Sequence, residues 1–145
     1  MSRPMPPLAT VDAEAFLAVP PALAAPRLAD PDHQARWARG LVLHPYEDRG
    51  TEGVRAVVSG RLVGRVEWWL EPVAAPAGVQ VHFWLAATPT GDGDRRPVAP
   101  GRWQRRQQRL LLEAVRRRWR AALFALADEV GTTGLGSAPT PPQET

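Results

Sequence analysis

The longest regular pattern of apolar positions runs from Trp103 to Val130, a stretch without Gly or Pro in a chain that has 12 Gly and 16 Pro. On a helical wheel, apolar residues gather on one side of this stretch and arginines on the other. The apolar side consists of Leu111, Val115, Trp119, Ala122 and Leu126. The basic side consists of Arg102, Arg105, Arg106, Arg109, Arg116, Arg117 and Arg120. The pattern predicts a long amphipathic helix with one buried face.

Apolar and polar residues alternate upstream of this helix, as is typical of strands with one buried face. The predicted strands are Leu41–Asp48, Gly53–Ser59, Leu62–Pro72 and Gly78–Ala87. Their short connections indicate an antiparallel meander. Parity places an apolar set on one face: Val54, Ala56, Val58, Val66, Trp68, Leu70, Val79, Val81, Phe83 and Leu85. The other face collects Arg55, Ser59, Arg65, Glu67, Trp69, Glu71, Gln80, His82 and Trp84.

The N-terminal part is expected to open with a short strand and a short helix. Leu8–Val11 is predicted as the strand, and Asp12 is a suitable N-cap for a helix over Ala13–Ala18. Pro20 and Pro21 then end that helix.

A second short helix is expected where Asp30 and Pro31 provide the preferred N-cap and first helical residue. It runs through Trp37 to about Arg39, and Gly40 ends it. The segment before it, 22–30, is rich in Ala and Pro and gives no clear prediction.

These elements predict a single α+β domain, which is the expected number of domains for 145 residues. A curved antiparallel sheet of about five strands would grip the long C-terminal helix, with one or two short helices near the N-terminus. Residues 1–7 are expected to be a flexible N-terminus, 8–130 the domain, and 131–145 a disordered tail.

Composition excludes several kinds of chemistry. The absence of Cys rules out disulfides, thiolate zinc sites and cysteine nucleophiles, and favours a cytoplasmic protein. His33, His44 and His82 lack metal-ligand spacing, and the chain has no Gly-rich phosphate loop or serine nucleophile elbow. We therefore expect no metal and no cofactor. No stretch is apolar enough to predict a membrane span.

All 18 basic residues are Arg, which indicates a GC-rich bacterial genome, and the net charge is only +3. The arginines of the long helix form either a solvated face or a surface for nucleic acid or another protein. Nucleic acid is the less favoured of these partners.

The order of elements resembles the helix-grip fold of the START-like (SRPBCC) superfamily, especially its polyketide cyclase/dehydratase-like bacterial members. The resemblance rests on ATVDAEAFLAV, ARW, EDRGTEGVRAVVSGRLVGRVEWWLEPV, VQVHFWLAATP and RRRWRAALFALADEV. The chain departs from the family pattern at Pro20 and Pro21, which interrupt the first helix, and between Trp37 and Gly53, where few residues remain for strands. The second departure predicts a reduced cavity.

The resemblance implies a hydrophobic cavity between sheet and helix that binds a lipid, a polyketide or another flat apolar molecule. The expected wall consists of Val66, Trp68, Val81, Phe83, Leu111, Val115 and Trp119. The alternative is a filled core, because close packing is the default for protein interiors. A ligand-binding protein is the favoured function. A cyclase, aromatase or dehydratase is the enzymatic alternative, and an interaction domain that uses the Arg-rich helix face is the third.

Four polar residues are weak candidates for catalysis. Arg55, Glu67 and His82 share the polar face, where a Glu67–His82 pair would orient an imidazole for acid–base work. The alternative is an ionic network on the outside of the sheet. Arg118 lies at the edge of the apolar helix stripe, so its guanidinium either reaches solvent or enters the space beneath the helix.

Trp69 and Trp84 are two large aromatic residues on the polar face. They indicate a covered surface, formed either by a homodimer or by the short helices, and more weakly a stacking platform for single-stranded nucleic acid beside Arg55 and Arg65.

Overall fold

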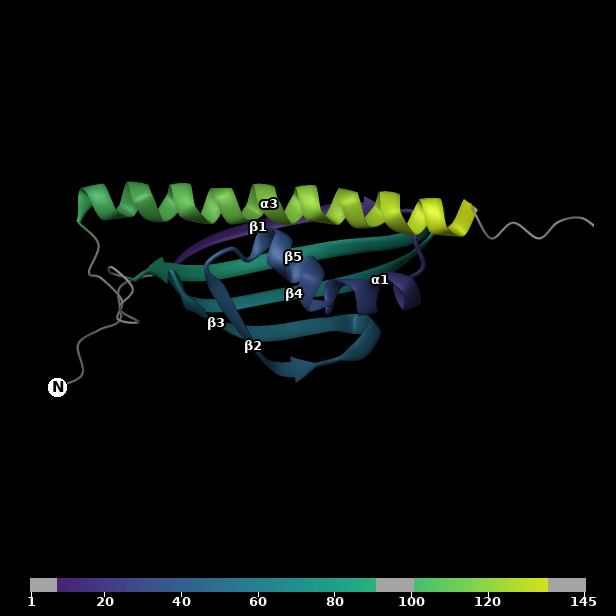
Figure 1. Cartoon of the computed structure of the whole chain (residues 1–145), viewed down its shortest axis with the longest axis horizontal. Helices are drawn as coiled ribbons and strands as arrows, with labels where there is room; N and C mark the ends of the chain where they lie inside the picture. Colours follow the sequence, from purple (N-terminus) through teal and green to yellow (C-terminus); the bar gives the residue numbers. More distant parts are fainter. Residues whose placement is uncertain (1–7, 91–100, 136–145) are drawn as a thin grey trace, which may run out of the picture.

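The computed structural model describes residues 8–90 and 101–135, which form one antiparallel sheet with helices on its concave side (Figure 1). Its elements in chain order are β1 (Ala9–Leu17), α1 (Pro21–Leu28), α2 (Pro31–Trp37), β2 (Leu41–Asp48), the 3₁₀ turn η1 (Gly50–Glu52), β3 (Gly53–Gly60), β4 (Leu62–Ala74), β5 (Ala77–Pro89) and α3 (Arg102–Leu135). The five strands lie in the order β1-β5-β4-β3-β2. The predicted α+β class, the curved five-stranded sheet and the long C-terminal helix are confirmed.

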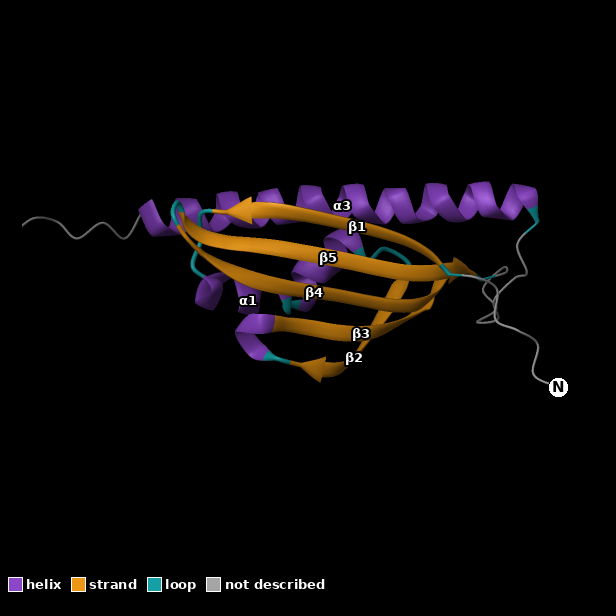
Figure 2. Ribbon diagram, turned by 180° about the vertical axis from the view of Figure 1, so that it is seen from behind, coloured by secondary structure: helices purple, strands orange, loops and turns teal. Residues whose placement is uncertain are grey.

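The helices divide the concave side between them. The long helix α3 runs along the β1 side of the sheet and contacts β1, β5 and α2 (Figure 2). The short helix α1 contacts η1 and β4. The helix α2 contacts both α1 and α3. The sheet, α2 and α3 therefore enclose one common interior.

The division of the sheet into two faces follows the predicted parity. All ten residues assigned to the apolar face are buried. Trp68 on β4 stands opposite Val54 on β3 and Phe83 on β5, so side chains of one face meet across neighbouring strands. The period of two in the sequence was sufficient because a strand turns alternate side chains to opposite faces.

The buried stripe of α3 is slightly rotated from the predicted one. Leu112 and Leu123 are fully buried together with Val115, Trp119, Ala122 and Leu126, whereas Leu111 is only partly buried. The helix also continues to Leu135, five residues beyond the predicted end at Val130, because Gly131 is tolerated inside a helix at a modest cost. Residues 136–145 of the expected tail and the expected flexible lead, 1–7, lie outside the described residues.

The predicted helix over Ala13–Ala18 is wrong. Residues 13–17 of that segment belong to β1, which pairs with β5 along its whole length and places Ala13 opposite Phe83. Its inward side chains are partly buried at every second residue up to Leu17. This period of two, combined with the free edge of β5, outweighs the N-cap signal of Asp12.

The short helices follow the local signals at their ends. Asp30 caps α2 by accepting a hydrogen bond from the Asp32 backbone N–H at 2.8 Å, as its sequence predicts. The helix ends at Trp37, and Gly40 turns the chain into β2 with a φ of 71°. Upstream, Pro20 and Pro21 begin α1 as its N-cap and first residue, and the rest of this helix lies in the segment 22–30 that gave no clear prediction.

Candidate functional site

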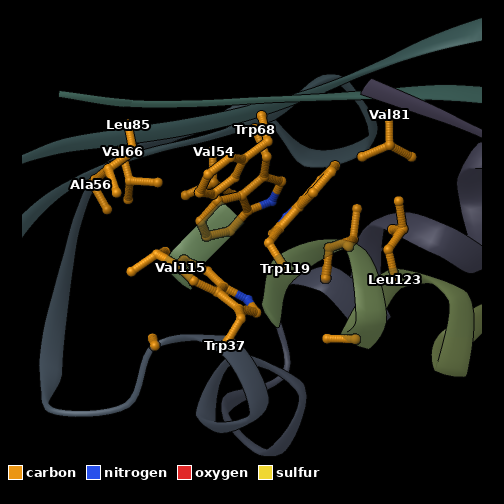
Figure 3. Close-up of a cluster of buried hydrophobic side chains, with 14 of the residues drawn as sticks. Trp37, Val54, Ala56, Val66, Trp68, Val81, Leu85, Val115, Trp119 and Leu123 are labelled. Atoms are coloured by element: carbon orange, nitrogen blue, oxygen red, sulfur yellow. The ribbon is translucent and has the colours of Figure 1, made fainter. Parts of the chain in front are cut away.

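Four aromatic rings dominate the interior enclosed by the sheet, α2 and α3. Trp37 at the end of α2 meets Trp68 edge to face, with ring centroids 6.1 Å apart, and Phe83 at 5.5 Å. Trp119 from α3 stacks on Phe83, with ring centroids 4.8 Å apart. Figure 3 shows the Trp37 ring extending from α2 into the side chains that the sheet and α3 contribute. The edge-on and offset contacts are those that aromatic quadrupoles favour.

The residues predicted to form the cavity wall are brought together around these rings. Val66, Trp68, Val81, Phe83, Val115 and Trp119 are all at most 4% exposed, and Leu111 packs against them from the margin. Side chains occupy the space between the sheet and α3. The sequence did not single out Trp37, although its large apolar ring on a short helix just before the sheet was the available signal.

A hollow of about 420 Å³ opens beside this interior, between α2 and the beginning of β2. Its lining includes Ala35 and Ala38 from the α2 side and Leu41 and Leu43 from β2. Leu41 and Leu43 also pack against the core, so the same two side chains contact both the hollow and the apolar interior. Because Ala38 follows Trp37 directly, the hollow adjoins the backbone that carries the buried indole.

Arg55 and Glu67 form the ionic network that was the alternative to catalysis. Arg55 Nε donates to Glu67 Oε1 at 3.1 Å, and Arg49 donates to the same oxygen at 3.0 Å. Glu47 completes the network by accepting from Arg55 Nη1 at 3.2 Å. The hydrogen bond and charge of Glu67, together with the charge of Glu47, raise the pKa of Arg55. This network lies on the convex face, away from α3.

The Glu67–His82 pair is not formed. The register places Trp84 opposite Glu67 and His82 opposite Trp69, one pleat further along. His82 instead lies between Glu14 on β1, at 3.3 Å from Nδ1, and Glu71 on β4, at 3.1 Å from Nε2. Its ring stacks on Trp69 with centroids 4.9 Å apart.

The remaining predicted site residues also lie outside the interior. Trp84 lies beneath the guanidinium of Arg65, whose carbon is 5.9 Å from the ring centroid. Arg118 is exposed to solvent, which is the first of the two positions considered for it. Contacts within one chain thus account for the half-buried positions of Trp69 and Trp84, and a homodimer through that face stays a prediction.

Within the ranges that the structure describes, three polar residues are buried without having been predicted to be: Gln108, His33 and Thr88. Gln108 is 4% exposed on the inner side of α3 and donates from Nε2 to the Ala87 carbonyl at 2.9 Å. His33 on α2 is 6% exposed, and neither ring nitrogen has a hydrogen-bond partner among the described residues. Burial lowers the pKa of His33, and the positive charge of Arg36 lowers it further. Gln108 lies one helical turn before Leu112, and this spacing from the buried stripe could have predicted its burial.

The described residues were also compared with the requirements for a metal centre and for a membrane-spanning helix. Within residues 8–90 and 101–135, no group of three or more His, Asp or Glu side chains is placed to hold a metal ion. In the same part of the chain, every helix is too short or too polar to cross a membrane.

Comparison with solved structures confirms the predicted helix-grip fold. The di-domain aromatase/cyclase StfQ from the steffimycin biosynthetic pathway superposes with a TM-score of 0.50 at 14% identity, over 87% of this chain and 53% of its own length. The chain thus spans about half of that protein. The likeness at this identity concerns the fold alone.

Other solved structures are similar at slightly lower scores. The Zhui aromatase/cyclase from Streptomyces sp. R1128 has a TM-score of 0.46 at 18% identity, over 84% of this chain and 93% of its own. Ara h 8.0201 has a TM-score of 0.48 at 14% identity, over 86% and 99%. No family model matches the sequence, and no curated protein matches it.

Proposed function

We propose that the chain binds a small hydrophobic molecule, lipid-like or polyketide-like, between the sheet and α3, and that Trp37 closes this site. One observation supports the proposal above all. The indole of Trp37 comes from a helix of only seven residues and stands edge-on against Trp68 and Phe83, beside a hollow of about 420 Å³. A flat ligand would take the position of the indole, and Trp37 would move toward the hollow.

The wall of the proposed site is the predicted one: Val66, Trp68, Val81, Phe83, Leu111, Val115 and Trp119. A wall of aliphatic and aromatic side chains suits an apolar ligand, because contacts with it bury apolar surface without leaving polar groups unpaired.

Binding is favoured over catalysis by the positions of the ionisable side chains. Arg55, Glu67 and His82 lie on the convex face, and Arg118 is exposed. Among the described residues, the buried polar side chains are Gln108, Thr88 and His33, and His33 lies near the far end of α3 beside Leu126. A cyclase or dehydratase would need an acid or base that touches its substrate.

The test uses N-phenyl-1-naphthylamine, an uncharged fluorophore that the arginines of α3 do not attract. We expect micromolar binding with a blue shift, and displacement by 1,8-dihydroxyanthraquinone for a polyketide-like site or by oleic acid for a lipid-like one. Trp37→Leu should tighten binding severalfold, because an open site no longer spends binding free energy on moving the indole.

The matched control is Trp69→Leu, the same substitution on the convex face of the sheet. It should leave probe binding unchanged. A folded Trp37→Leu variant that binds no probe would refute the proposal. If Trp37→Leu does not fold, Trp37→Phe keeps an aromatic ring and is expected to bind more tightly than the wild type in the same assay.

A further inference from the structure

The outer side of α3 carries a row of exposed apolar residues. Trp103 is 68% exposed, Leu110 60% and Phe124 48%. These positions, with Arg117 between the last two, are spaced by seven residues, which places them on nearly the same side of the helix. That side is opposite to the buried stripe centred on Trp119. We call Trp103, Leu110 and Phe124 the outer stripe.

Arginines surround the outer stripe. Between Arg102 and Arg120 the helix has eight Arg and one acidic residue, Glu113. Glu113 accepts a hydrogen bond from Arg116 Nε at 3.0 Å and forms an ion pair with the same guanidinium. The other seven arginines are exposed, and within the described part of the chain none of them forms an ion pair. The outer side of α3 therefore combines a large positive charge with large apolar side chains.

The helix that carries this surface is straight and lies along one border of the molecule (Figures 1 and 2). From Trp103 to Phe124 the outer stripe extends for about 32 Å, at about 1.5 Å per residue. A straight row of this length fits a flat partner better than a curved one.

The charge decides among the possible partners. A second copy of the chain would bring the same arginines together, so repulsion opposes a dimer through this face. A nucleic acid would match the arginines but leave Leu110 and Phe124 without apolar contacts. An anionic phospholipid surface matches both, because headgroup phosphates pair with guanidinium groups while Trp, Leu and Phe side chains enter the acyl boundary.

We propose that the outer face of α3 binds peripherally to anionic phospholipid membranes. Trp103, Leu110 and Phe124 insert at the level of the headgroups, and the surrounding arginines contact the phosphates. The helix lies in the plane of the surface while its other side stays packed on the sheet. This function is independent of the space closed by Trp37 and uses the opposite side of the same helix.

Co-sedimentation of the full chain with vesicles tests the proposal. We expect binding to phosphatidylcholine vesicles with 30% phosphatidylglycerol, weak binding to pure phosphatidylcholine, and release by 0.5 M salt. Replacing Arg106, Arg117 and Arg120 by Gln should weaken binding about a hundredfold, at about fivefold per arginine. Replacing the outer stripe by Gln should weaken binding about tenfold or more.

The matched control is a Gln triple at Arg39, Arg61 and Arg65, which are exposed on other parts of the surface. It should bind much as the wild type does, and so should Trp37→Leu. Equal losses in the two arginine triples would overturn the proposal. So would an outer-stripe variant that binds normally, absence of binding to the anionic vesicles, or tighter binding to duplex DNA than to these vesicles at the same salt concentration.

Discussion

Trp119 on α3 stacks on Phe83 of β5, with ring centroids 4.8 Å apart and ring planes inclined by 26°. Both side chains are at most 1% exposed, and Phe83 also meets Trp37 from α2. One ring of the sheet thus contacts aromatic side chains of both α2 and α3. The position of α3 on the sheet depends on this contact more than on any ion pair, because aromatic burial of this size contributes several kcal/mol.

Trp119→Ala should therefore destabilise the domain by about 3 to 5 kcal/mol, the usual cost of removing a buried Trp. Urea denaturation followed by circular dichroism measures the loss. Trp103→Ala is the control on the same helix, because a side chain that is 68% exposed should change stability by at most about 0.5 kcal/mol. An unchanged free energy of unfolding for Trp119→Ala would mean that α3 does not pack as described.

Gly131→Ala should stabilise the domain by about 0.5 to 1 kcal/mol. The residue lies inside α3, and a Cβ at this position meets no atom within 4 Å, so Ala would gain helix propensity without a clash. Gly64→Ala is the contrasting variant, because its Cβ would run into the backbone carbonyl of Ala86 on β5 and should destabilise the sheet. Thermal melts that leave Gly131→Ala equal to the wild type would contradict a helix that continues past Val130.

His33 should make the fold less stable in mild acid. Burial and the charge of Arg36 lower its pKa in the folded chain, whereas the unfolded chain takes up the proton near pH 6.5. Below that pH the unfolded state binds more protons, so stability is full above pH 6.5 and falls as the pH drops toward the lower folded value. The titratable groups that line a pocket together with His33 are Arg27, Asp30, Asp32, Arg36 and Glu129.

Denaturant unfolding at pH 7.5 and 5.5 measures this loss. His33→Gln should reduce the difference between the two pH values, because Gln does not titrate. His44→Gln is the matched substitution at an exposed position on β2. Identical pH dependence in the wild type and His33→Gln would show that another group is responsible.

Glu67→Gln should cause a small loss of stability that disappears in high salt. Glu67 accepts hydrogen bonds from both Arg49 and Arg55 on the convex face, where solvent screens the charges. The loss should be much smaller than that of Trp119→Ala. Melting curves at 0.05 M and 1 M salt test this, and a loss that persists in 1 M salt would mean that packing, not charge, holds the network.

Local patterns predicted most of the architecture. Alternation over Gly53–Ser59 and its neighbours was enough to sort the two faces of the sheet, and the Asp30–Pro31 pair was enough to begin α2. The local patterns gave a wrong prediction for Ala13–Ala18, where the N-cap signal of Asp12 competed with pairing to β5. A short apolar segment is compatible with both the helical and the strand period, and only pairing with a neighbouring strand decides between them.

The sequence by itself determined which residues are buried on the sheet and that a long helix must cover them, because burial follows the period of each element. Only the tertiary structure decided what stands between sheet and helix. Trp37 reaches Phe83 from 46 positions away in the sequence, and His82 meets Glu14 and Glu71 instead of Glu67. Such contacts depend on strand register and on the path of α2, which arise from the packing of the whole chain and leave no periodic mark in any one segment.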